Sequence, residues 1–172
     1  MRDKLRALLG IESGEESMVS MLLTQSVFLG IFLGSFDITA HSLFLSVFDE
    51  KMMARGYIAS GITGFILTSL YSWFHKSIKF RNLAIINLII ATGLTIFLWS
   101  ALIIAPAKWM TFIVFIMLGP LNILALLGFR ETAGCLFTVN QRTRLNRLMD
   151  SGLIIGILII SFTIAGLMVV KF

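Results

Sequence analysis

Five long apolar stretches, separated by short polar connections, make up most of this chain. A helix needs about 20 apolar residues to cross the hydrocarbon of a bilayer. No strand-like alternation and no glycine- and serine-rich linker competes with a helical interpretation. The pattern therefore predicts an all-α integral membrane protein, with one helical bundle over residues 18–172. The five expected transmembrane helices cover residues 18–48, 57–74, 82–104, 109–129 and 152–170.

Composition supports a membrane protein and excludes several other classes. The chain is 58% hydrophobic and 13% charged, whereas a soluble domain is typically about half apolar and a quarter charged. The single cysteine, Cys135, and two distant histidines exclude an internal disulfide and make a metal site unexpected. Phosphate-binding loops, zinc-binding HExxH and nucleophile elbows are absent, so we expect neither an enzyme nor a cofactor. Basic residues lie at membrane edges, and nucleic acid is therefore not an expected partner.

Residues 1–17 form a cytoplasmic N-terminal tail in this interpretation. Arg2, Lys4 and Arg6 lie among apolar residues that recur at helical spacing. This pattern suits a short amphipathic helix on the inner membrane face. A frayed, solvated tail is the alternative. The acidic segment 12–16 separates these charges from the first apolar stretch, so the tail is not a cleaved signal peptide.

The distribution of Lys and Arg among the connections predicts the orientation. Ten lie in the tail and in the second and fourth connections, and four lie in the remaining segments. The positive-inside rule places the ten in the cytoplasm. We therefore expect a cytoplasmic N-terminus and, after five spans, a C-terminus outside.

The fourth connection, residues 131–150, differs from the others in length and composition. Its apolar residues are scattered among polar ones, which predicts a short cytoplasmic surface helix before the last span. Arg142, Arg144 and Arg147 would form a basic cluster near anionic headgroups. Asp150 and Ser151 are expected to cap the start of the fifth span.

Small residues at four-residue spacing predict faces for close helix packing. Such faces matter in lipid, where no hydrophobic force drives helices together. They could be used within the bundle or by a partner chain. The pairs are Gly30 and Gly34, Ser60 and Gly64, and Gly152 and Gly156.

Asp37 and His41 are the strongest candidates for chemistry. They are four residues apart and so share a helical face. An ionisable group in a span costs several kcal/mol unless it is paired or meets water. One interpretation is a proton- or substrate-coupling site facing a cavity. The other is that Asp37 lies near the outer interface and ends a helix.

Gly119, Pro120 and Asn122 interrupt the fourth apolar stretch. Proline removes one backbone hydrogen bond, which predicts a helix kink at Gly119 and Pro120. Asn122 could satisfy a freed backbone group or line a cavity. Broken helices mark the sites of many transporters, although a purely structural kink is also possible.

Four segments of the chain carry a resemblance to a known family: residues 36–45, 57–64 with the basic turn 75–81, 118–123, and 136–138 with 142–153. Together they resemble the N-terminal half of ATP/ADP translocase-like proteins, which are related to the major facilitator superfamily. That resemblance covers nearly the whole chain and implies a facilitator-like bundle in a bacterial-type inner membrane. A facilitator half has six spans, however, and this chain has five predicted ones. No Lys or Arg lies deep in a span, so a nucleotide substrate is implied by the resemblance alone.

Two functions follow as expectations. The first is a transporter-related module that alternates access around a site at the membrane midplane near Asp37, His41 and Asn122. The second is a non-transporting structural or assembly subunit of a larger membrane complex. Besides the lipid bilayer, we expect a second membrane chain or a further C-terminal half as partner, because five spans supply at most one of two rocking bundles.

Overall fold

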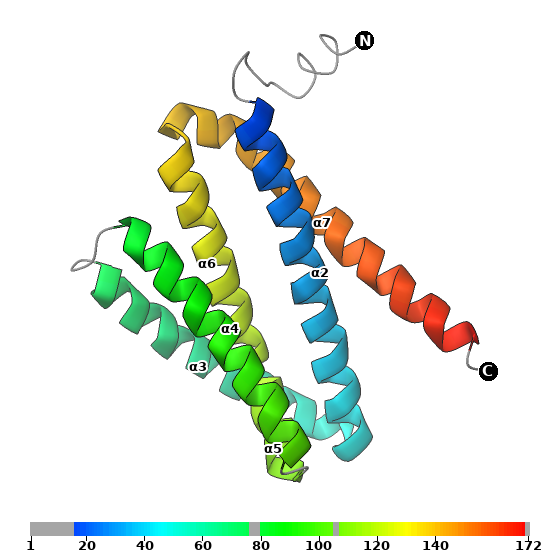
Figure 1. The fold of residues 1–172 in the computed structure, drawn as a ribbon. Helices are drawn as coiled ribbons and strands as arrows, with labels where there is room; N and C mark the ends of the chain where they lie inside the picture. The colour runs from blue at the N-terminus through cyan, green and yellow to red at the C-terminus, as the bar shows by residue number, and fades with distance from the viewer. Residues whose placement is uncertain (1–15, 76–79, 105–106, 171–172) are drawn as a thin grey trace. The chain divides into compact units, whose positions relative to one another are not determined.

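The computed structural model of the protein describes residues 16–75, 80–104 and 107–170. Within these ranges the chain forms helices and no strand, as the sequence predicts (Figure 1). Residues 1–15, on which the predicted amphipathic tail falls, lie outside the described part. The helices are α2 (Glu16–Val47), α3 (Glu50–His75), α4 (Phe80–Ile104), α5 (Lys108–Ile116), α6 (Leu118–Leu136) and α7 (Val139–Val170).

Among the described residues, three helical segments are long and apolar enough to cross a membrane. They are residues 16–47, 108–134 and 145–167, and the described part of α4 adds a shorter apolar segment, residues 88–104. The fold is therefore compatible with a multi-pass membrane protein. The α3 helix is less apolar because hydroxyl and aromatic side chains interrupt its aliphatic residues. The presence of five transmembrane helices stays a prediction.

The segment before the last apolar stretch differs from the prediction. No separate surface helix precedes a fifth span, because α7 runs without interruption from Val139 to Val170. At its start, Gln141 Oε1 accepts hydrogen bonds of 2.9 Å from both the backbone N–H and the hydroxyl of Thr138, and the first of these is one half of a capping box. The expected cap at Asp150 and Ser151 is wrong, since Ser151 lies inside the helix and donates to the Arg147 carbonyl at 2.7 Å.

The chain divides into two compact units, which we describe separately. The first unit comprises residues 1–35 and 133–172, and the second comprises residues 36–132. The α2 and α6 helices each contribute to both. The first unit therefore contains most of α2 and all of α7, and the second contains α3, α4, α5, most of α6 and the end of α2.

In the first unit, α2 and α7 run in the same direction and touch through small residues. We call this contact the α2–α7 interface. Ser26 lies against Gly152, Gly30 against Gly156, and Gly34 against Ile160. A Cβ added at Gly30 would collide with the backbone carbonyl of Leu153, and one added at Gly156 with that of Val27. Both predicted GxxxG faces are thus used within the chain.

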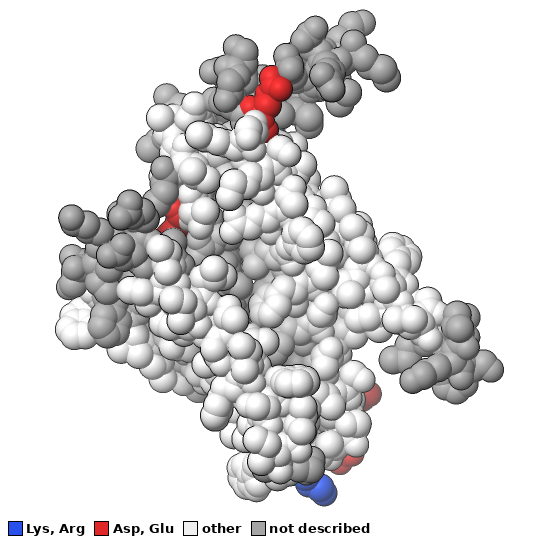
Figure 2. Space-filling view, viewed as in Figure 1, with Lys and Arg blue, Asp and Glu red and all other residues white. Residues whose placement is uncertain are grey.

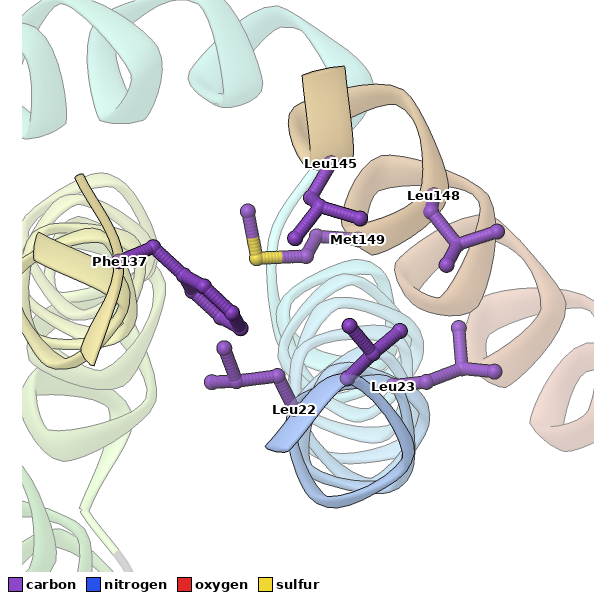
Figure 3. A pocket seen from close by; sticks show the side chains of 7 residues that line it. Leu22, Leu23, Phe137, Leu145, Leu148 and Met149 are labelled. Atoms are coloured by element: carbon purple, nitrogen blue, oxygen red, sulfur yellow. The ribbon is translucent and has the colours of Figure 1, made fainter. Parts of the chain in front are cut away.

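Near the start of these two helices, apolar side chains surround a small cavity. Figure 3 shows that they point toward one another from α2, α7 and the short segment after α6. The cavity volume is about 10 Å³, which is room for about one water molecule. It is an imperfection of packing and not a substrate site. Its lining is Val19, Leu22, Leu23, Phe137, Leu145, Leu148 and Met149.

In the second unit, α3 packs along α5 and α6 in the same direction. We call this contact the α3–α6 interface. Gly56 lies against Phe115, Ser60 against Gly119, and Gly64 against Ile123, so the register is constant over two helical turns. Hydroxyls elsewhere on α3 bond back to their own helix: Thr63 donates to Ala59 at 2.8 Å. Such bonds give each hydroxyl a hydrogen-bond partner, so that it is not left unpaired in apolar surroundings.

The outer surface is dominated by exposed apolar side chains. Figure 2 shows one face on which the described side chains are almost all uncharged. A soluble protein rarely exposes so many large apolar residues together, and lipid is the solvent that suits them. Examples are Phe28, Phe65, Leu88, Trp99, Ile104, Trp109 and Phe162, all more than 60% exposed.

Candidate functional site

The strongest candidate site lies in the second unit, around the imidazole of His41 on α2. The Asp37 backbone carbonyl is 2.8 Å from Nδ1 of His41, and the Tyr57 hydroxyl of α3 is 2.5 Å from Nε2. Both ring nitrogens therefore have partners. The Asp37 carboxylate lies further away, with Oδ1 3.6 Å from Nδ1.

Aromatic rings hold the imidazole in place from one side. The Phe115 ring of α5 meets the His41 ring edge-on, with centroids 5.2 Å apart, and lies equally close to Tyr57. Phe44, one turn further along α2, packs on Phe115 at 4.3 Å and is fully buried. Ring packing of this kind fixes the imidazole relative to α3 and α5.

The side chains of Asp37 and His41 are partly exposed. The Asp37 side chain is 50% exposed and the His41 side chain 25%. Asp37 also lies ten residues before the end of α2 at Val47, so it does not end a helix. The alternative in which Asp37 terminates α2 is thus wrong, and a half-exposed carboxylate remains inside a helix apolar enough to span a membrane.

The three residues of the site lie at similar distances from the ends of their helices. His41 lies about 9 Å from the end of α2, and Tyr57 and Phe115 each lie about 10 Å from the starts of α3 and α5. Charged residues mark these helix ends. The site therefore lies about 10 Å along the helix axes from these charged residues. The charged residues are Asp49, Glu50, Lys51 and Lys108.

Asn122 is not part of this arrangement. It lies seven residues beyond Phe115, which is about 10 Å further along the helix axis. Its Oδ1 is buried, and no described residue hydrogen-bonds it. The structure thus brings together Asp37 and His41 of the three predicted coupling residues, and places Asn122 about two helical turns away.

The predicted kink region contains a helix break. The α5 helix ends at Ile116, Met117 forms a turn, and α6 begins at Leu118. Pro120 lies in the first turn of α6, where its missing N–H leaves no helical bond unmade. Gly119 N–H also lacks a helical acceptor there, and Ser60 Oγ accepts it from α3 at 3.0 Å.

The basic cluster lies near the start of α7 in the first unit. The side chain of Arg147 is exposed. The backbone of Arg142 and Arg144 is helical, whereas their side chains lie outside the described part. Among the described residues, no three potential metal ligands lie close enough to share an ion.

Two tyrosines of α3 contribute interactions that sequence reasoning missed. Tyr57 is the partner of His41, although it lies 16 residues away on another helix. Tyr71, four turns further along, interacts with the Glu131 carboxylate of α6. Their spacing of 14 residues places both on one face of α3. Only that spacing could have indicated them, on a helix whose charged residues lie near its start.

No known protein family, curated protein or solved structure matches this chain. The resemblance to ATP/ADP translocase-like proteins therefore stays a prediction.

Proposed function

We propose that this chain is a transporter-related membrane module in which Asp37 and His41, supported by Tyr57, form the coupling site. The supporting observation is the half-exposed carboxylate 3.6 Å from an imidazole, inside a helix apolar enough to span a membrane. Ionisable residues in such helices are costly, and they commonly mark ion or substrate pathways. The sequence resemblance suggests the ATP/ADP translocase-like and major facilitator type and leaves the substrate open.

The proposed topology has five spans, a cytoplasmic N-terminus and an external C-terminus in a bacterial-type inner membrane. Back-bonded hydroxyls on α3 support its inclusion as a span. The lone Cys135 can be replaced by serine, which gives a background for single-cysteine labelling. A membrane-impermeant maleimide added outside should label Lys51→Cys and spare Arg144→Cys. Labelling of both from the outside would contradict the model.

A transport assay tests the function. The protein, together with any chain that co-purifies with it in mild detergent, is reconstituted in vesicles of phosphatidylethanolamine and phosphatidylglycerol. The exchange of radiolabelled ADP is measured first because of the resemblance. Asp37→Asn should abolish uptake while leaving insertion and folding unchanged, because the amide keeps the shape and removes the charge. Thr39→Ala is the matched control, since Thr39 is exposed on the same helix two residues away. Normal transport by Asp37→Asn would refute the proposed site.

A non-transporting subunit of a larger complex is the second candidate. One observation favours it: both glycine interfaces are closed within this chain, whereas a wide apolar face of α4 stays uncovered by the described residues. Mild-detergent purification of the natural complex distinguishes the two functions. A co-purifying chain without a facilitator-like half supports the subunit. Transport by the chain alone in vesicles excludes it.

A further inference from the structure

The partners of His41 decide which of its ring nitrogens carries a proton. Nδ1 lies 2.8 Å from the backbone carbonyl of Asp37. A carbonyl oxygen only accepts hydrogen bonds, so Nδ1 must be the donor and must carry hydrogen. The imidazole is therefore held in its Nδ1–H tautomer whenever it is neutral.

Nε2 is then the nitrogen with a free lone pair. In the neutral ring it accepts a hydrogen bond from the Tyr57 hydroxyl, 2.5 Å away. A hydroxyl can both donate and accept. When a proton binds to Nε2, the same pair remains bonded with reversed polarity: Nε2–H donates to the Tyr57 oxygen, and the hydroxyl hydrogen turns away.

We infer that His41 Nε2 is a proton-binding site and that Tyr57 reverses its hydrogen bond each time the proton binds or leaves. The step is balanced, because one proton enters, one N–H bond forms and no other bond breaks. The role of this proton as the coupling ion rests on the transport function proposed above. Its chemistry rests on the contacts of His41 alone.

The charged and titratable groups facing the ring are few. From α2 itself the Asp37 carboxylate faces Nδ1 at 3.6 Å, where it can partner the positively charged ring. From α3 only Tyr57 contacts the ring. Arg55, also on α3, is exposed and directs its guanidinium toward Met52 Sδ at 3.7 Å. From α5 the ring meets the apolar Phe115.

Nitrogen-15 NMR of the full chain in lipid nanodiscs tests the inference. The chain has two histidines, so His75→Gln leaves His41 as the sole labelled imidazole. In the neutral ring Nδ1 should give a protonated signal and Nε2 an unprotonated one, and when a proton binds, Nε2 should gain hydrogen while Nδ1 stays protonated. A neutral form with hydrogen on Nε2, or an Nε2 signal that never changes, would overturn the inference.

The hydrogen-bond reversal has its own readout. Tyr57→Phe should move the unprotonated Nε2 signal toward that of a nitrogen without a hydrogen bond. Tyr71→Phe, the other tyrosine of the chain and also on α3, is the matched control and should leave the signal unchanged. If the Tyr57→Phe signal does not move, Tyr57 is not the partner. Because this measurement needs no transport, failure of the vesicle assay with the expected NMR result would refute the transport function and keep the proton site.

Discussion

The α2–α7 and α3–α6 interfaces both join helices that run in the same direction through small residues four apart, yet different atoms close them. At the centre of the first, backbone meets backbone: the added Cβ at Gly30 or Gly156 would strike a carbonyl of the facing helix. Side chains complete its two ends, where Ser26 faces Gly152 and Ile160 faces Gly34. In the second, side chains fill the space. Phe115 covers Gly56, the Ser60 hydroxyl covers Gly119, and the end of Ile123 covers Gly64.

This difference separates a rigid contact from an adaptable one. Backbone atoms on two packed helices cannot move apart locally, whereas a hydroxyl or a terminal methyl group can rotate. Ionisable and polar groups gather beside the adaptable interface, at Tyr57 near one end and Tyr71 near the other. The α3–α6 interface can therefore accommodate small shifts of its side chains that the backbone contacts of the α2–α7 interface do not allow.

The largest expected effect is at the α2–α7 interface. Gly156→Ala should lower the free energy of unfolding by about 3 kcal/mol, because the methyl group meets the Val27 carbonyl and the helices must separate. Reversible unfolding in mixed micelles measures it. Gly166→Ala on the same helix is the control, since nothing lies within 4 Å of its added Cβ. Equal stability of the two variants would show that α2 and α7 are not in close contact.

A smaller loss is expected at Gly56 in the α3–α6 interface. The added Cβ would lie 2.7 Å from the Phe115 ring, which can shift, so Gly56→Ala should cost about 2 kcal/mol. Gly61→Ala on α3 has open space and serves as control. Phe115→Leu should partly rescue Gly56→Ala in a double-mutant cycle, because the smaller side chain leaves room. Strict additivity of the two changes would contradict contact through the ring.

The sequence predicted these interfaces in part. Glycine spacing identified the faces of α2 and α7, because helical periodicity determines which residues share a side. It could not identify which helix each face meets, since that depends on tertiary packing. The spacing of Asp37 and His41 predicted a shared helical face for the same local reason. The part played by Tyr57 could not be predicted, because its contact with His41 joins two helices.

The start of α7 shows a different kind of error. Thr138 and Gln141 form the T-x-x-Q pattern of a capping box, and this signal was present in the sequence. The change from polar to apolar residues after Asp150 predicts a later helix start instead. Hydropathy marks where a helix enters an apolar environment, whereas capping marks where its hydrogen bonds begin. In α7 the two places are about three turns apart.

The smallest expected effect concerns the one side-chain hydroxyl that crosses the α3–α6 interface to a backbone group among the described residues. Ser60→Ala removes the acceptor of the Gly119 N–H, which lies in the first turn of α6 and has no helical partner. The change should lower the free energy of unfolding by about 1 kcal/mol, because hydrogen bonds between membrane helices are weak and the N–H is only partly buried. Ser69→Ala is the matched control, since Ser69 donates only to the Phe65 carbonyl of its own helix. Amide exchange gives a second measurement: in Ser60→Ala the Gly119 amide should exchange faster, while the amides of Gly30 and Gly156 keep their rates. Unchanged exchange at Gly119 would mean that Ser60 does not hold the start of α6, and that the α3–α6 interface is closed by apolar contacts alone.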